Sequence, residues 1–280
     1  MTFDTHMHTE LCGHAVGSPR EYVSAAHTRG VDLIAFTCHV PMQNALFGER
    51  STRMALGDLP RYRDMVADAR EYGAQIGVEV LYGIEAEVFP DAAEMAAMDE
   101  VLASDTFDFV LGSLHHQLRS YQERIARKGW NSDARIIADY FEALTAAASR
   151  GRYDSFAHPD LIRIYGTVEP FHPSEYETLI REFLSAAAEN GVCIEVNTSG
   201  YIKGVHEVHP HPVIMEWAAE IGTQFTMGSD SHRPEQVAQC FERAYAELHS
   251  AGIGSTCYFR NGRKVEISLE EQTARSGCPI

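Results

Sequence analysis

The chain has 280 residues, of which 45% are hydrophobic, so it is long enough to bury a sizeable core. Its 23 basic and 40 acidic residues give a formal net charge of -17 with histidine neutral, which disfavours binding to nucleic acid or to an anionic membrane surface. This charge does not exclude a small phosphorylated substrate, because bound metal cations reverse the sign of the field locally.

Processing signals and cysteine usage indicate the expected compartment. The N-terminal segment has neither a basic n-region nor an apolar h-region, so we expect no signal peptide. No apolar run reaches the roughly 18 to 20 residues of a membrane span. The six cysteines are scattered and form no Cys-x-x-Cys pair, which predicts reduced thiols in a cytoplasmic protein rather than a disulfide scaffold or a zinc ribbon.

Short apolar runs alternate with longer amphipathic segments along the chain. The expected strands are residues 2–6, 31–37, 79–84, 107–113, 153–157, 192–196, 223–228 and 254–259. Helix-start signals lie between them, at Ser18-Pro19, Asp58, Ser132 and Pro173-Ser174. Glycines expected to follow helix ends are Gly30, Gly73, Gly151, Gly191 and Gly222. Asn261-Gly262 predicts the turn of a C-terminal hairpin whose second strand is 264–267.

The repeated alternation of strand and helix predicts a parallel sheet with helical crossovers. At this length we expect a closed or distorted (β/α)7 TIM-like barrel rather than an open doubly wound sheet. No Gly-x-Gly-x-x-Gly motif follows the first strand, which argues against a dinucleotide-binding fold. Because we find no repeat, low-complexity tract or long linker, residues 1–280 are expected to form a single domain.

Metal-competent side chains follow the ends of seven expected strands. Histidine is unusually frequent, at 14 of 280 residues. In chain order, the strand ends carry His6, His8 and His14; His39; Glu85; His115; His158; Glu195 and Asn197; and Asp230 and His232. Since the C-terminal ends of parallel barrel strands meet on one rim, where barrel enzymes have their active sites, we expect a metal site there.

The spacing and the number of these residues indicate more than one ion. His6 and His8 point to the same face of a strand, because side chains alternate with period two, and Asp230 and His232 repeat that spacing. The full set suits two or three divalent ions, each with three or four protein ligands and open positions. Imidazole and carboxylate suit zinc, iron or manganese. Cys12 and Cys38 lie beside these positions and are expected to pack.

These motifs resemble the polymerase and histidinol phosphatase (PHP) family, most closely its stand-alone histidinol-phosphatases. The resemblance covers residues 6 to 232 and implies a distorted (β/α)7 barrel with a trinuclear metal site. It is carried by His6-Met7-His8, Cys12-Gly13-His14, Phe36-Thr37-Cys38-His39-Val40-Pro41, Gly83-Ile84-Glu85, Gly112-Ser113-Leu114-His115, Ala157-His158-Pro159-Asp160, Glu195-Val196-Asn197-Thr198-Ser199-Gly200 and Gly228-Ser229-Asp230-Ser231-His232.

The family pattern also implies how the ligands are shared among three ions. The implied sets are His6, His8, Glu85 and Asp230 for the first ion; Glu85, as a bridge, with His115 and His158 for the second; and His14, His39 and His232 for the third.

The expected activity is metal-dependent hydrolysis of a small phosphate monoester, most specifically of L-histidinol phosphate to L-histidinol and phosphate in histidine biosynthesis. We expect attack by a metal-bridging hydroxide, with Glu85, Asp230 and His232 as catalytic residues. Arg163 and Lys203 are predicted to hold the phosphate, with a solvated surface cation as the alternative for each. The other predicted substrate contacts are His116, Glu195, Asn197 and His206.

Some of these residues have a second interpretation. Glu195 and Asn197 are equally expected to orient metal ligands, and packing is the alternative for His116. His206 belongs with His209 and His211 to a proline-interrupted loop before a helix, which is predicted either to help close the pocket or to be an ordinary rim loop.

Three alternative functions remain open from the sequence. A PHP-type nuclease would share the ligands, but the net charge of -17 and the lack of a basic stripe oppose it. An amidohydrolase-like hydrolase also begins with His-x-His, but has no evident use for His14, His39 and Glu85 together. A non-catalytic metal-storage or sensing protein would not need open coordination positions. The native metals, the alcohol half of the substrate and the oligomeric state are left open.

Overall fold

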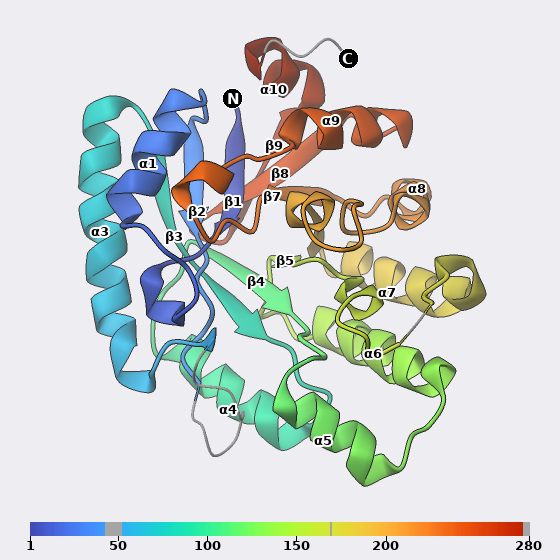
Figure 1. Ribbon diagram of the computed structural model, residues 1–280. Helices are drawn as coiled ribbons and strands as arrows, with labels where there is room; N and C mark the ends of the chain where they lie inside the picture. Colours follow the sequence, from blue (N-terminus) through green and yellow to red (C-terminus); the bar gives the residue numbers. More distant parts are fainter. Residues whose placement is uncertain (43–51, 169, 277–280) are drawn as a thin grey trace.

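Seven parallel strands form the centre of the molecule in a computed structural model that describes residues 1–42, 52–168 and 170–276 (Figure 1). The strands follow one another in the sheet in sequence order. They are β1 (Phe3–Met7), β2 (Leu33–Phe36), β3 (Glu79–Glu87), β4 (Phe109–Ser113), β5 (Ser155–Phe156), β6 (Cys193–Asn197) and β7 (Phe225–Gly228). With helices between the strands, this arrangement confirms the predicted (β/α)7 barrel.

The barrel closes through a short contact between β1 and the segment after β7. The backbone N–H of His8 donates to the carbonyl of Ser231 at 2.9 Å, and the N–H of Ser231 donates to the carbonyl of His6 at 3.1 Å. Met7 and Ser231 form an isolated parallel bridge there rather than a continuous ladder. The closing contact therefore brings the His-x-His motif of β1 next to the segment that carries Asp230.

The helices surround the strands (Figure 1). They are α1 (Pro19–Thr28), α3 (Leu59–Ile76), α4 (Ala92–Ala103), α5 (Arg119–Lys128), α6 (Asp133–Ala148), α7 (Glu177–Glu189), α8 (Pro212–Ile221), α9 (Phe241–Ser250) and α10 (Leu269–Ser276). Ser18 begins α1 with a capping box to Glu21 and a proline at the first turn, as its sequence predicts. At Pro173-Ser174 the structure has a 3-10 turn first, and α7 begins only at Glu177. None of the helices described is long and apolar enough to cross a membrane.

The predicted C-terminal hairpin is present and covers the end of the barrel where the strands begin. Its strands are β8 (Ser255–Arg260) and β9 (Arg263–Ser268), and both turn residues have a positive φ, as the Asn-Gly sequence predicts. The N–H of Gly262 donates to the carbonyl of Asp108 at 3.1 Å, and Arg260 pairs with Glu79 at the start of β3. The hairpin therefore packs against this end of the barrel, and the strand ends lie at the opposite end.

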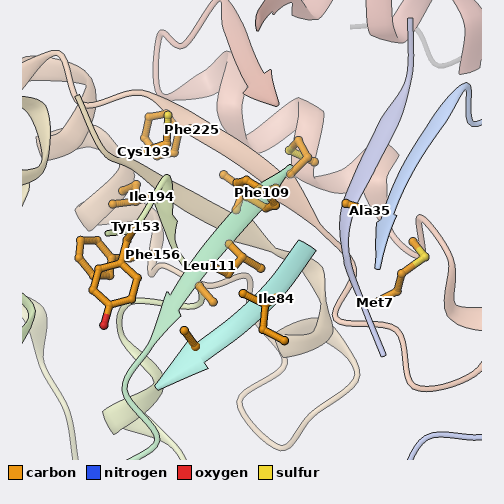
Figure 2. Close-up of a cluster of buried hydrophobic side chains, with 14 of the residues drawn as sticks. Met7, Ala35, Ile84, Phe109, Leu111, Tyr153, Phe156, Cys193, Ile194 and Phe225 are labelled. Atoms are coloured by element: carbon orange, nitrogen blue, oxygen red, sulfur yellow. The ribbon is translucent and has the colours of Figure 1, made fainter. Parts of the chain in front are cut away.

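The barrel strands carry both core and site side chains. Figure 2 shows buried apolar side chains gathered from several strands, among them Ile84, Leu111, Phe156 and Ile194, all fully buried. On β3, Glu85 shares one face with Glu87, while Ile84 points to the other face. The same strand therefore contributes both to the apolar core and to a buried polar face.

Asp154, just before β5, gives a pH-dependent prediction for stability. Burial raises the pKa of its carboxyl to about 6, although its Oδ2 accepts a hydrogen bond from the N–H of Val110. A carboxyl whose pKa is raised on folding contributes stability below its unfolded pKa of 3.8, and that contribution is lost as the pH rises through 6. We expect Asp154→Asn to raise the free energy of unfolding at pH 8 by at most about 3 kcal/mol.

The measurement is denaturant unfolding of both proteins at pH 4 and pH 8. The amide oxygen of the variant still accepts the hydrogen bond from Val110, so little difference is expected at pH 4. An equal change in unfolding free energy at the two pH values would show that ionisation of Asp154 does not contribute.

Candidate metal centre

The nine predicted metal ligands converge where the barrel strands end. His6 lies on β1, Glu85 lies on β3, and the others lie in the loops that follow the strands. Ring contacts, ion pairs and short polar contacts link all nine residues into one cluster, made up of His6, His8, His14, His39, Glu85, His115, His158, Asp230 and His232. Their grouping on one rim is what the strand-end pattern in the sequence predicts.

Glu85 lies at the centre of this cluster and is almost fully buried. Its Oε1 is 3.2 Å from Nε2 of His158 and 3.5 Å from Nε2 of His115. Its Oε2 contacts Nδ1 of His39 and is 3.7 Å from Nε2 of His6. Neither oxygen has a hydrogen bond of acceptable geometry within the described part of the chain. A buried carboxylate left in this state is costly unless a cation satisfies it.

Asp230 is a second carboxylate on which several ligand side chains converge, next to the end of β1. Its Oδ1 is 3.1 Å from Nε2 of His8 and 3.6 Å from Nε2 of His6. Its Oδ2 accepts hydrogen bonds from Lys203 Nζ at 2.9 Å and from Ser199 Oγ at 3.0 Å. Asp230 has a φ of 53°, a left-handed conformation that is uncommon for a residue other than glycine and is concentrated at functional sites.

The outer part of the cluster consists of imidazoles that approach one another closely. Nε2 of His14 is 2.8 Å from Nε2 of His232, and the rings of His8 and His232 stack with their centroids 4.0 Å apart. Nε2 of His8 is also 3.1 Å from Nε2 of His6. Repeated approach of imidazole nitrogens to one another is the arrangement expected of ligands that face shared ions.

These donors can be grouped into sets of metal-ligand size. Within each set, one ligand atom from each residue lies within 4.8 Å of the others. The sets include His6, Glu85 and His158; His6, His8 and Asp230; and His8, His39 and His232. Three overlapping sets of imidazole and carboxylate donors fit the predicted two or three divalent ions.

The protonation states also suit metal binding. Burial alone would raise the pKa of Glu85, but the neighbouring His39, His115 and His6 outweigh it and hold this pKa well below its usual value. Burial lowers the pKa of His39 and of His115, and it lowers that of His232 to about 3. His39, His115 and His232 are therefore neutral, the form of imidazole that binds cations, and they lie beside an ionised carboxylate. Burial would lower the pKa of His6, but Glu195, Asp230 and Glu85 outweigh it and raise this pKa well above its usual value, so a cation bound there displaces a proton.

Buried carboxylates hold the far sides of the imidazoles. Oε1 of Glu195 is 2.7 Å from Nδ1 of His6, and Oε2 accepts hydrogen bonds from Asn197 and from the backbone of His158. Glu87 binds Nδ1 of His115 in the same way, at 3.0 Å. Such contacts fix the tautomer and orientation of a metal-binding imidazole. Glu195 and Asn197 are fully buried, so the geometry favours a role in orienting the metal-binding imidazoles over contact with the substrate.

Gly228 gives a test of this packing. A Cβ atom at this position would collide with Oε1 of Glu195 and approach Cβ of His6 at 2.6 Å. We expect Gly228→Ala to displace His6 and weaken metal binding by about 10- to 100-fold, as loss of an orienting contact does. Metal content after dialysis measures this effect. Gly204→Ala is the matched control, because nothing lies within 4 Å of its added Cβ atom; equal metal retention by both variants would contradict the prediction.

A cavity of about 280 Å³ lies over the cluster. Six of the nine predicted ligands border it: His14, His39, His115, His158, Asp230 and His232. Arg53 and Lys203 bring positive charge to it, and Leu118, Leu161 and Tyr165 contribute apolar and aromatic surface. A cavity of about 480 Å³ also exists at the opposite end of the barrel, but its charged groups are engaged in the Arg70–Asp108 and Arg260–Glu79 ion pairs.

Arg53 is a site residue that the sequence analysis did not identify. Its side chain is only 3% exposed, and its Nη2 donates to Oε2 of Glu87 at 3.1 Å. Its Nη1 donates to the carbonyl of Thr52 at 2.8 Å, while Nε is buried and has no partner among the described residues. The residue lies in a loop without strand or helix periodicity. The sequence signal that could have indicated a buried cation here is Glu87. It follows Glu85 with the spacing that places both carboxylates on one face of the strand.

Two predicted substrate contacts lie outside this cavity. The guanidinium of Arg163 is 3.0 Å from Asp160 and 2.8 Å from Glu207, and its side chain is 4% exposed. Arg163 therefore fixes the loop beside the site and has no free face toward the cluster. His116 is buried, its Nε2 is bound to the carbonyl of Ile164 at 2.9 Å, and burial lowers its pKa to about 4. This environment makes His116 a packing residue, contrary to the predicted substrate contact.

The histidines of the loop before α8 have separate surroundings. His206 is exposed and does not border the cavity, so this arrangement does not support its predicted substrate contact. Nδ1 of His209 is 2.6 Å from Oδ1 of buried Asp160. Nδ1 of His211 accepts a hydrogen bond from the N–H of Val213 at the start of α8. The predicted loop before a helix is therefore confirmed.

Comparisons with known proteins agree with this geometry. The family model of the PHP domain matches residues 4–199. The chain is 33% identical over 268 residues to a Deinococcus radiodurans protein named "Probable histidinol-phosphatase", covering 94% of this chain and 98% of that relative. It is 27% identical over 283 residues to a Schizosaccharomyces pombe protein of the same name, covering 94% and 90%.

A solved structure has the same fold. It is the histidinol phosphate phosphatase of Lactococcus lactis complexed with zinc, L-histidinol and phosphate, with a TM-score of 0.77, 20% identity, and coverage of 94% of this chain and 98% of that one. The matched PHP domain residues run from β1 to the segment after β6 and include seven of the nine predicted metal ligands. The resemblance inferred from the motifs is thus confirmed, and the chain belongs to the PHP domain family.

Proposed function

We propose that this protein is a metal-dependent phosphomonoesterase that hydrolyses L-histidinol phosphate to L-histidinol and phosphate. The observation that carries the proposal is the buried carboxylate of Glu85, whose two oxygens lack hydrogen bonds while imidazoles of four strand ends surround it. The substrate is supported by the relatives named for histidinol phosphate hydrolysis.

The cluster is proposed to hold two or three divalent ions, with zinc, manganese and iron as candidates. The proposed ligands are those of the predicted sharing, with Glu85 as the bridge. Zinc is supported by the solved relative that is complexed with it. When bound, the ions supply a water that is deprotonated near neutral pH and positive charge for the phosphoryl oxygens.

Two cations of the chain are proposed to bind the phosphate. Arg53 presents a guanidinium whose Nε has no partner among the described residues, and such a planar group can bind two phosphate oxygens at once. Lys203 also borders the cavity, beside Asp230. Burial lowers the pKa of Lys203, but Asp230 outweighs it and raises this pKa above the usual value, so Lys203 is charged at neutral pH. Both side chains therefore neutralise a phosphate dianion.

The shape and charge of the site suit a small metabolite. A cavity of about 280 Å³ is at the small end of ligand pockets, and Tyr165 with Leu161 gives it an apolar wall suited to a flat imidazole. The net charge of -17 opposes a nucleic-acid substrate. We further propose that the protein acts in the cytoplasm, in histidine biosynthesis, which its five free cysteines within the described residues support.

Phosphate release from a panel of phosphomonoesters tests the proposal. The panel contains L-histidinol phosphate, other amino-alcohol and sugar phosphates, and a single-stranded oligonucleotide for the nuclease alternative. We expect kcat/KM for L-histidinol phosphate to exceed the others by at least about 100-fold, because a polar site rejects analogues that leave its groups unpaired. Failure of the metal-loaded protein to release phosphate from any member would refute the proposed activity.

A further inference from the structure

A pair of buried cysteines adjoins the outer histidines of the metal centre. Cys12 ends the 3-10 turn that follows β1, and Cys38 immediately precedes His39. Both thiols are fully buried. The sequence analysis expects them to pack only, but their surroundings are polar rather than apolar.

The sulfur of Cys12 lies among metal-ligand side chains. One ligand atom each from Cys12, His14 and His232 lie within 4.8 Å of one another, and the same holds for Cys12, Cys38 and His8. Nδ1 of His8 is buried and has no hydrogen-bond partner among the residues described. A buried imidazole nitrogen without a partner beside a thiol is a second sign that a ligand belongs between these groups.

Cys38 is arranged to orient Cys12. The backbone N–H and the hydroxyl of Thr9 both donate to the sulfur of Cys38 at 3.3 Å, so this sulfur already accepts two hydrogen bonds. The S–H of Cys38 can then donate to one of two acceptors. One is the carbonyl of Thr9 at 3.7 Å, and the other is the sulfur of Cys12. In the second arrangement the sulfur of Cys12 is an acceptor and presents its lone pairs to the histidines.

We propose that Cys12 is a thiolate ligand of the outermost metal ion, which it shares with His14 and His232, and that Cys38 is its positioning residue. On binding, the sulfur forms a bond to the ion and the thiol proton is released to solvent. Thiolate is a soft ligand that favours zinc, iron or cobalt over manganese or magnesium. The outermost position therefore selects a thiophilic ion. This inference rests on the metal centre of the proposed function.

A second thiol pair supplies a matched control. Cys193 and Cys257 are also buried and hydrogen-bonded to each other. Cys193 begins β6 and Cys257 lies on β8, at the end of the barrel away from the metal centre. The charged groups that act on this pair are Lys264, Glu266 and Asp154. Substitution of Cys193 thus changes a buried thiol without touching the metal centre.

The test loads metal-stripped protein with Co²⁺ under anaerobic conditions and records its near-ultraviolet absorption. We expect a thiolate-to-cobalt charge-transfer band in the wild-type protein and in Cys193→Ser, and its loss in Cys12→Ser. The affinity for one ion should fall by at least about 10- to 100-fold in Cys12→Ser, with the other ions retained. A band that persists in Cys12→Ser would overturn the proposal.

The wild-type spectrum decides the question even where Cys12→Ser fails to fold. Cobalt bound by wild-type protein with no thiolate band would refute the role of Cys12 and leave the proposed phosphatase intact. Wild-type protein that binds no cobalt, zinc or manganese would instead contradict the proposed function and this inference together.

Discussion

Glu85→Gln should lower kcat/KM for L-histidinol phosphate by on the order of 10³-fold, because the variant loses a negative charge at the centre of the site. The neutral amide brings an N–H₂ group among imidazoles that face the present carboxylate from 3.2 to 3.8 Å. It can neither bridge two cations nor balance their charge. We therefore expect the variant to lose at least one bound ion. Steady-state kinetics and metal analysis of the same preparation measure both effects.

The control for this substitution is Glu123→Gln. The Glu123→Gln substitution makes the same change of charge. The ion-pair partner of Glu123 is the exposed Arg119, also on α5. Activity and metal content of that variant should equal those of the wild-type protein. A Glu85→Gln protein that keeps both its full metal content and its wild-type kcat/KM would show that Glu85 is not the central ligand.

Replacement of Arg53 should give the second largest loss of kcat/KM, and we expect this loss to come from weaker substrate binding. Arg53→Gln removes a buried cation from the cavity, and we expect kcat/KM to fall by about 100-fold, mainly through KM. Arg53→Lys keeps the charge but loses the planar fork, so its effect should be intermediate. The kinetics of the two variants with L-histidinol phosphate, compared with inhibition by inorganic phosphate, measure the lost phosphate contact.

Stability must be separated from binding in this experiment. Arg53→Gln also leaves Glu87 without its cation, and loss of one partner of a buried ion pair costs about 3–5 kcal/mol. Part of this cost is offset because Glu87 also binds His115. The double variant Arg53→Gln with Glu87→Gln should recover stability but not KM. A wild-type KM in folded Arg53→Gln would contradict the assigned phosphate contact.

The barrel and the clustering of its candidate metal ligands were predictable because both depend on local pattern. Alternating apolar runs and helix signals specify strand–helix repeats, and the parallel arrangement then brings all strand ends to one rim. His6, Glu85 and His158 could be grouped for this reason, although 152 residues of sequence separate the first from the last. The Asn261-Gly262 hairpin was predictable too, since its turn requires positive φ at both residues.

The remaining features depend on contacts between distant segments. Gly73 was predicted to follow a helix, but it lies within α3, where its missing side chain leaves room for the carbonyl of Val78; the helix ends at Gly77 instead. Arg163 was predicted to hold phosphate, but Asp160 and Glu207 occupy its guanidinium. A cation in a sequence does not reveal whether a carboxylate from another loop already pairs with it.

Arg53 was missed for the reverse reason. Its loop has no periodicity, and only the tertiary fold brings it to Glu87 and the cavity. Glu195 illustrates a third limit, because a carboxylate at a strand end has the same sequence signature whether it faces a substrate or, as here, the far side of an imidazole. Sequence pattern therefore located the site, whereas the identity of the groups that face the cavity required the structure.

The most direct test of the account is metal removal and restoration. The protein is stripped with a chelator, metal analysis confirms that no divalent ion remains, and L-histidinol phosphate turnover is followed as Zn²⁺ or Mn²⁺ is added back. The account predicts no turnover by the stripped protein and recovery as two or three ions bind per chain. Undiminished phosphate release by protein shown to be free of metal would contradict it.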